Sequence, residues 1–370
     1  MNYLKNPVLV ARIQYFFGVK TEIKATHEQK KEKSNNKYII ENRFWYYLFL
    51  FGTALGDETF YAFFIPFWFW NIDGAVGRRF VLVWSIVMYI GQGIKDIIRW
   101  PRPGPPVVQL QNKWAVEYGM PSTHAMVGVS IPFSVFLFTL NRYQYSTSLG
   151  LSVAILWCTL ICVSRLYLGM HTILDIIVGL ILAVLLMCVM VPFVDLLDDY
   201  LLRSSTSPLL LLVSSILMIV YYPNSGKWTP TRGDTTMIIS VCVGIHIGAW
   251  LNFQTGLMTP TELAAPYVIM WPSYTMLGCM VMRTSIGFTC VILSKDICKN
   301  LTYNFLCTLL KEDVDNLKKS ENTLQNKHKT FVELCYKYIY CSMVGFNTVY
   351  LLPQLFRFLK IERPTFFTEI

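Results

Sequence analysis

Long apolar runs separated by short polar stretches dominate the pattern of hydrophobic positions along this chain. Runs with few charges lie at residues 80–93 (extended by the amphipathic 94–100), 125–140, 148–163, 173–194, 208–222, 237–253 and 264–281. Three further runs contain charges: 44–70 with Asp57 and Glu58, 284–310 with Lys295 and Asp296, and 334–358. Bilayer-spanning helices need about 20 predominantly apolar residues, so the pattern predicts an all-α, multi-pass membrane protein with about eight to ten transmembrane helices.

Composition supports this class, because 54% of the residues are hydrophobic, only 15% are charged and the mean hydropathy is +0.43. The ten cysteines lie in or beside apolar runs and form no Cys-x-x-Cys pair, so we expect buried thiols. We expect no metal, no cofactor and no nucleic-acid partner, since the basic residues do not form a clustered, aromatic-interleaved face.

Charge divides the chain into three parts. Residues 1–43 carry nine Lys or Arg against four Glu and are expected to form a basic extramembrane tail, either attracted to anionic headgroups or simply a solvated arm. Residues 44–200 are expected to form a core of helices that carries three polar clusters. Residues 201–370 add further transmembrane helices, with a charged loop near 311–330.

The first polar cluster lies where the run 80–100 ends. Lys95 and Arg102 are seven residues apart and would project from one face of a helix, with Arg99 beside them. Cations are costly inside a bilayer, so three at one helix end indicate either an anionic ligand or snorkelling to lipid headgroups.

The second cluster, Pro121-Ser122-Thr123-His124, directly precedes the run 125–140. Unpaired N–H groups and the positive end of the dipole favour an anion at such a helix start. Ser122 or Thr123 can equally be a helix cap and His124 an interfacial histidine, although a capping hydroxyl can still donate to a phosphate oxygen.

The third cluster contains Ser164-Arg165, His171 and Asp175. A helix beginning near Gly169 would place His171 and Asp175 on one face, where the carboxylate fixes the imidazole tautomer and leaves the other nitrogen free to attack phosphorus. Arg165 can bind phosphoryl oxygens in a bidentate manner. Taken alone, the His–Asp pair equally fits structural support or a proton relay.

Helix counting predicts that the three clusters share one membrane face. The run 80–100 ends in the first cluster, 125–140 leaves from the second, and 148–163 returns to the third. Two histidines, a carboxylate and three or four cations suffice for metal-independent phosphoryl transfer. Since the clusters lie between apolar runs, the expected substrate is a lipid phosphate.

This combination resembles the type 2 phosphatidic-acid phosphatase superfamily. Its signature is a Lys with Arg-Pro seven residues later, a Pro-Ser-x-His, and a Ser-Arg followed by His and Asp. The sequence fills every catalytic position, although Thr123 stands where the superfamily usually has Gly. The longer strings 51–61, 117–126 and 164–175 are similar to the sphingosine-1-phosphate phosphatases in particular.

The resemblance implies a six-helix phosphatase core and a role for each site residue. His171 would be the nucleophile and form a phosphohistidine, Asp175 would orient it, and His124 would protonate the leaving alkoxide and then activate water. The residues implied to bind the phosphate are Lys95, Arg102, Ser122, Arg165 and, through its backbone amide only, Thr123.

The resemblance also implies a sphingoid base phosphate as substrate, membrane lipids as surroundings, and an endoplasmic reticulum membrane with a lumenal active site. The basic connectors at Arg78, Arg79 and Arg142 favour that orientation. Two alternatives stay open: a broader lipid, polyprenyl or sugar phosphate phosphatase, and a non-catalytic scaffold or transporter. The oligomeric state and the preference between sphingosine and dihydrosphingosine phosphates are left undetermined.

Overall fold

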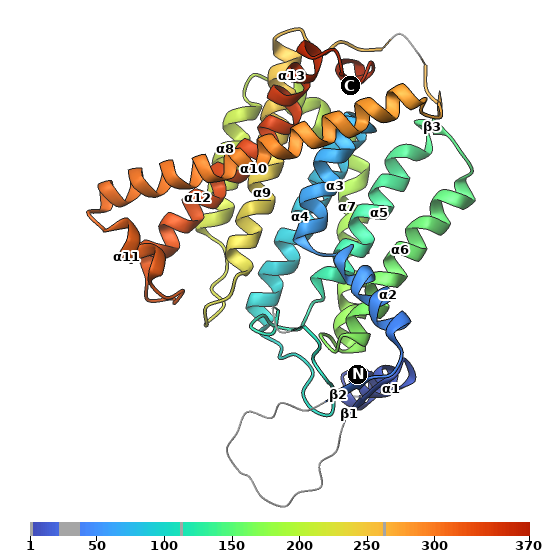
Figure 1. Cartoon of the computed structure of the whole chain (residues 1–370), viewed down its shortest axis with the longest axis vertical. Helices are drawn as coiled ribbons and strands as arrows, with labels where there is room; N and C mark the ends of the chain where they lie inside the picture. The colour runs from blue at the N-terminus through green and yellow to red at the C-terminus, as the bar shows by residue number, and fades with distance from the viewer. Residues whose placement is uncertain (1–2, 22–37, 112–113, 262–263) are drawn as a thin grey trace, which may run out of the picture.

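The computed structural model of the 370-residue chain describes residues 3–21, 38–111, 114–261 and 264–370. Nearly all its regular structure is helical (Figure 1). The first seven helices are α1 (Pro7–Phe16), α2 (Arg43–Ala54), α3 (Glu58–Asn71), α4 (Gly74–Ile98), α5 (Thr123–Leu140), α6 (Thr147–Tyr167) and α7 (Ile173–Arg203). The remaining α-helices are α8 (Ser207–Val220), α9 (Thr231–Gln254), α10 (Tyr274–Leu310), α11 (Val314–Lys319), α12 (Lys327–Phe346) and α13 (Leu352–Phe358).

Two small sheets join distant segments. Strand β1 (Val19–Thr21) pairs antiparallel with β2 (Tyr38–Ile40), and β3 (Tyr143–Gln144) pairs in parallel with β4 (Tyr267–Val268). Figure 1 places the first pair at the end of the molecule that holds the N-terminus and the second pair toward the opposite end. The all-helical class predicted from the sequence is confirmed.

Among the described residues, six helices are long and apolar enough to cross a membrane: α4, α5, α6, α7, α9 and α10. Helices α2 and α3 meet at a 60° bend, and counting them as one broken span gives seven. This number is smaller than the eight to ten expected. Helix α8 has only 14 residues, which is shorter than a full bilayer crossing requires.

Helix α10 accounts for a further difference. Residues 264–281 and 284–310 were expected as two spans, but one continuous helix of 37 residues covers the last part of the first run and all of the second. It begins only at Tyr274, after Pro266 and Pro272, and contains no proline. The buried Arg283 does not interrupt it, because its guanidinium donates to Asn71 Oδ1 at 3.0 Å and to Ile361 O at 2.9 Å.

Helix α4 forms the centre of the bundle and packs against α5, α7 and α9. Its side chains Phe80, Val83 and Val87 are fully buried. A buried ion pair ties α4 to α7, since Arg78 Nε and Nη2 donate to the Asp198 carboxylate at 2.9 and 3.1 Å. The helices that carry the three clusters are thereby held in a fixed relation.

Helices α9 and α12 pack along each other at very close range. A Cβ added at Gly244 would lie 2.0 Å from Ser342 O, and one at Gly345 would lie 2.3 Å from Val241 O. Only glycine allows the two backbones to approach this closely. Helix α10 crosses the same side of the molecule obliquely (Figure 1).

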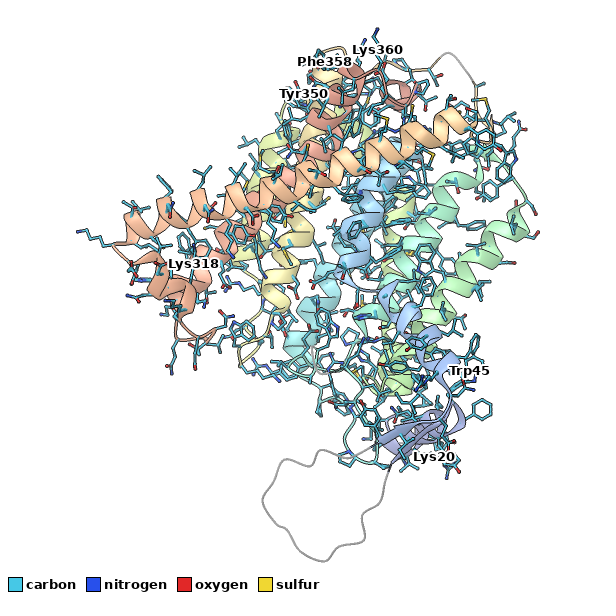
Figure 2. The ribbon with its side chains drawn as sticks, viewed as in Figure 1. Lys20, Trp45, Lys318, Tyr350, Phe358 and Lys360 are labelled. Atoms are coloured by element: carbon cyan, nitrogen blue, oxygen red, sulfur yellow. The ribbon has the colours of Figure 1, made fainter. Side chains whose placement is uncertain are left out.

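Part of the basic N-terminal region folds onto the core instead of forming a free arm. The buried Gln14 of α1 donates to Val108 O at 2.7 Å and to Tyr167 O at 2.8 Å, and accepts from Val108 N at 3.1 Å. Residues 22–37 of the expected tail lie outside the described residues. Figure 2 shows Lys20 and Trp45 at this end of the molecule, with Tyr350, Phe358 and Lys360 at the other.

Candidate active site

The three polar clusters meet at one end of helices α4 to α7. Lys95 lies in the last turn of α4, Ser122 caps the start of α5, and Asp175 lies in the first turn of α7. Ser122 N donates to Asp175 O at 3.1 Å, and a Cβ at Gly179 would lie only 2.7 Å from Ser122 O. This close packing brings the second and third clusters into contact.

His171 is buried between the ends of α6 and α7. Its Nε2 lies 3.3 Å from Arg102 Nη1, and its Nδ1 lies 3.9 Å from Asp175 Oδ2. Burial lowers the pKa of His171 well below its ordinary value, and the charges of Arg102 and Arg165 lower it further. The ring is therefore neutral near pH 7, with a nitrogen lone pair available for attack.

The expected hydrogen bond between His171 and Asp175 is not formed in this structure. Helix α7 begins at Ile173, not near Gly169, so His171 lies outside it. Asp175 instead closes a capping box, in which Oδ2 accepts from Thr172 N at 2.7 Å and Thr172 Oγ1 accepts from Asp175 N at 3.2 Å. Asp175 Oδ1 is buried and has no hydrogen-bond partner among the described residues.

His124 is the second residue of α5 and contacts an acidic residue that the sequence reasoning did not include in the site. Its Nε2 is 2.9 Å from Asp57 Oδ1. Asp57 caps α3 at the bend between α2 and α3. One feature of the sequence could have indicated Asp57 as a site residue, because Asp57 and Glu58 interrupt an otherwise apolar run.

The candidate phosphate-binding cations surround this end of the bundle. Lys95 Nζ donates to Thr123 Oγ1 at 3.0 Å, so Thr123 contacts a candidate phosphate-binding residue through its side chain and not only its backbone amide. Arg102 Nη1 donates to Met170 O at 2.8 Å. Arg165 Nη1 donates to Thr53 Oγ1 at 2.6 Å, whereas its buried Nε and Nη2 have no partner among the described residues and retain donors for a ligand.

Glu117 is a second site residue that sequence reasoning did not single out. Its Oε2 accepts from Lys95 Nζ at 2.9 Å and lies 3.9 Å from Arg102 Nη2. Burial acts to raise the pKa of Glu117, but the positive charges of Lys95 and Arg102 outweigh it and lower the pKa. Glu117 is therefore an ionised carboxylate among the cations.

A cavity of about 400 Å³ opens beside these groups and extends between α3, α4, α9, α10 and α12. Its polar end includes Glu117, Thr123 and His124, and its apolar wall includes Val241 and Val344. The volume lies within the ~300–1,000 Å³ typical of ligand pockets. Across the described residues, no group of three or more His, Cys, Asp and Glu side chains is arranged to hold a metal ion.

Residues 76–198, which carry all three clusters, match the model of the PAP2 superfamily, and this match defines the class of protein. Sphingosine-1-phosphate phosphatase 2 of Homo sapiens is 39% identical over 331 residues, covering 88% of this chain and 80% of the relative. Sphingosine-1-phosphate phosphatase 2 of Mus musculus is 37% identical over 361 residues, covering 97% and 98%. Sphingosine-1-phosphate phosphatase 1 of Rattus norvegicus is 39% identical over 325 residues, covering 87% and 74%.

This chain belongs to the sphingosine-1-phosphate phosphatase family of the PAP2 superfamily. No solved structure shows a significant match to it.

Proposed function

We propose that this protein is a metal-independent phosphoric monoester hydrolase that removes the phosphate from sphingosine 1-phosphate and related long-chain base phosphates. The observation that carries the proposal is a buried, neutral His171 beside Arg102, a residue that also contacts Glu117 in the wall of an apolar cavity. The relatives whose names include sphingosine-1-phosphate phosphatase support the substrate class.

In the first step, His171 Nε2 attacks phosphorus and the bond between phosphorus and the ester oxygen breaks. Nε2 is the nitrogen assigned to attack because it lies beside Arg102, whereas Nδ1 faces Asp175. Lys95, Arg102 and Arg165 stabilise the negative charge on the phosphoryl oxygens, and Ser122 donates its hydroxyl to them. Asp175, whose Oδ2 lies 3.9 Å from Nδ1, orients the ring once the hydrogen bond absent from this structure forms.

His124 donates a proton in the first step and accepts one in the second. It gives a proton to the leaving alkoxide, which becomes the alcohol of the free long-chain base, and such assistance is typically worth ~10²–10⁴-fold in rate. The neutral ring then takes a proton from water, which attacks the phosphohistidine. The bond between Nε2 and phosphorus breaks, inorganic phosphate leaves, and both histidines return to their initial states.

The hydrocarbon tail of the substrate occupies the cavity between α3, α4, α9, α10 and α12. Its wall is largely apolar and it reaches the site at Thr123 and His124. Burial of a chain contributes about 0.8 kcal/mol for each methylene group removed from water, so the cavity favours long-chain phosphates over sugar phosphates. We place the enzyme in the endoplasmic reticulum membrane with a lumenal site.

The decisive experiment measures phosphate release from sphingoid, glycerolipid, isoprenoid and glucose esters by purified wild-type protein and by His171→Ala. We expect the sphingoid ester to be hydrolysed most efficiently and His171→Ala to lose turnover by at least ~10³-fold, because no nucleophile remains. His328→Ala, at an exposed position bonded to Glu312, is the matched control and should retain activity.

Equal rates on all four esters would refute the assigned substrate class, and turnover by a correctly folded His171→Ala variant would refute the nucleophile. Inhibition by orthovanadate, which resembles the trigonal-bipyramidal transition state, is expected as well. Loss of activity on adding EDTA would instead indicate metal-dependent chemistry.

A further inference from the structure

Glu117 places a negative charge where a phosphate-binding site should be positive. Its side chain is 95% buried, with Oε2 held by Lys95 Nζ at 2.9 Å. Arg102 approaches the same residue twice, since its Nε donates to Glu117 O at 3.1 Å and its Nη2 lies 3.9 Å from Oε2. A carboxylate so close to these cations weakens their attraction for a phosphate, so its presence calls for a second role.

The other carboxylate oxygen indicates what that role is. Glu117 Oε1 is buried and has no hydrogen-bond partner among the described residues, although Glu117 is part of the cavity wall. A buried, ionised oxygen without a partner is costly, and the cost is removed when a donor arrives. Glu117 thus has one oxygen on Lys95 and one buried oxygen without a partner among the described residues, in a side chain that lines the cavity.

The charges around the cavity point to a cationic donor. Among its described lining residues, four are acidic and none is lysine or arginine: Asp57, Glu58, Glu117 and Asp234. Basic groups contact three of these carboxylates: Lys95 lies 2.9 Å from Glu117, His124 lies 2.9 Å from Asp57 and Lys337 lies 3.7 Å from Asp234. A negatively charged cavity wall favours a ligand that carries a cationic group next to its phosphate.

We propose that Glu117 Oε1 accepts a hydrogen bond from the protonated amino group of the substrate and thereby selects phosphate monoesters that carry an ammonium group on the adjacent carbon. A sphingoid base 1-phosphate has this arrangement, with the ester oxygen on one carbon and the nitrogen on the next. This inference rests on the proposed function, and it adds the group that distinguishes such a substrate from a glycerolipid phosphate.

This arrangement explains why the Glu117 carboxylate lies between Lys95 and the cavity. Lys95 binds the phosphoryl group, and Glu117 bridges Lys95 to the ammonium group, so phosphate and ammonium are bound side by side by oppositely charged groups that touch each other. An anionic lipid without the amine leaves Oε1 unpaired and meets a repulsive carboxylate. Specificity then arises both from attraction and from a penalty on the wrong ligand.

The test compares two single-chain phosphate monoesters of equal length, sphinganine 1-phosphate and octadecyl phosphate, with the wild-type protein and with Glu117→Gln. The wild type should favour the amine-bearing ester in kcat/KM. In Glu117→Gln this preference should fall by about 10-fold to 100-fold, the range for a hydrogen bond to a charged group. The change should come from poorer use of sphinganine 1-phosphate.

A purely structural role for Glu117, such as holding Lys95, would lower kcat/KM for both esters by the same factor and would overturn the proposal. Glu58→Gln is the matched control, because Glu58 is an exposed acid on the same cavity wall. If Glu58→Gln reduced the preference for sphinganine 1-phosphate as much as Glu117→Gln does, selection would depend on the overall negative charge of the cavity wall. That result would also refute the role of Glu117.

The wild-type measurement keeps the inference testable if Glu117→Gln fails to fold. Equal kcat/KM for the two esters in the wild type would overturn the role of Glu117 while leaving the hydrolase assignment intact. No phosphate release from either ester would instead mean that the proposed function itself has failed.

Discussion

The two histidines of the site have different electrostatic surroundings. His124 Nε2 lies 2.9 Å from the Asp57 carboxylate, whereas His171 Nε2 lies 3.3 Å from the Arg102 guanidinium. The Asp57 carboxylate can orient the His124 ring, whereas the Arg102 guanidinium disfavours a positive charge on His171. This difference suits one ring to proton transfer and the other to nucleophilic attack.

Asp57→Asn should therefore impair the step in which the alkoxide leaves. We expect kcat/KM for an alkyl phosphate to fall by at least ~10-fold, since part of the ~10²–10⁴-fold contribution of a general acid depends on orienting His124. Asp57 is a positioning residue in this scheme, so the comparison substrate is p-nitrophenyl phosphate. Its leaving group needs no proton, and its kcat/KM should change much less.

Glu58→Gln is the control for this prediction, because it removes the neighbouring charge without touching the contact between Asp57 and His124. It should leave the ratio between the two substrates unchanged. Equal losses on alkyl and p-nitrophenyl phosphates in Asp57→Asn would show that Asp57 supports the fold and not proton transfer.

At the scale of elements, α9 and α12 extend the site beyond the residues that match the PAP2 model. The model match ends at residue 198, yet Val241 of α9 and Val344 of α12 form part of the cavity wall. Their close packing at Gly244 and Gly345 fixes the spacing of this wall. We therefore expect the additional helices to supply the binding site for a long chain.

Val344→Phe should shorten the cavity without reaching the phosphate-binding residues. We expect KM for an 18-carbon sphingoid phosphate to rise on the order of 10-fold, because excluding two methylene groups costs about 1.6 kcal/mol at ~0.8 kcal/mol each. The kinetics of an eight-carbon analogue should change little. Steady-state assays in detergent micelles of fixed composition provide the measurement.

The control for this substitution lies on the same helix. Ile339 of α12 is 44% exposed on the outer surface, so Ile339→Phe adds similar bulk without entering the cavity. It should behave as the wild type on both chain lengths. A Val344→Phe variant that affects short and long chains alike would contradict the location assigned to the tail.

At the scale of the whole molecule, the three clusters lie at one end of the bundle and the connectors with Arg78, Arg79 and Arg142 lie at the other. These arginines have structural partners: Arg78 contacts Asp198, Arg79 contacts Asp195 at 2.6 Å, and Arg142 contacts Asp73 at 2.5 Å. They were expected to be basic connectors with no other evident use, and the ion pairs correct that view. Under the positive-inside rule, the membrane orientation of a protein depends on the number of Lys and Arg residues in its connectors and not on their net charge. The three paired arginines therefore still favour the cytosolic side, and a lumenal site remains the prediction.

Microsomes test this orientation directly. A short-chain, membrane-impermeant sphingoid phosphate should be hydrolysed slowly by intact vesicles and at least several-fold faster after permeabilisation, because a lumenal site is shielded by the bilayer. A cytosolic phosphatase of the same preparation serves as the control and should be unaffected by permeabilisation. Full activity in intact vesicles would place the site on the cytosolic face.

The apolar runs determined the helical class, and the spacing of the polar residues determined the family. Both are properties of residues that lie near one another in the sequence. A membrane helix requires an uninterrupted apolar segment, and a cluster such as Pro121-Ser122-Thr123-His124 marks a helix start wherever it occurs. The sequence alone therefore led to the prediction of His124, His171, Asp175 and the candidate phosphate-binding cations as site residues.

Only the tertiary structure decided which distant residues complete the site. Asp57 reaches His124 because α2 and α3 meet at a bend, and Glu117 reaches Lys95 because the loop after α4 folds back across its end. The cavity depends on how α9 and α12 pack against α3 and α4. Such contacts join residues far apart in the chain, and the pattern of apolar and polar positions predicts a shared membrane face but not which side chains on it meet.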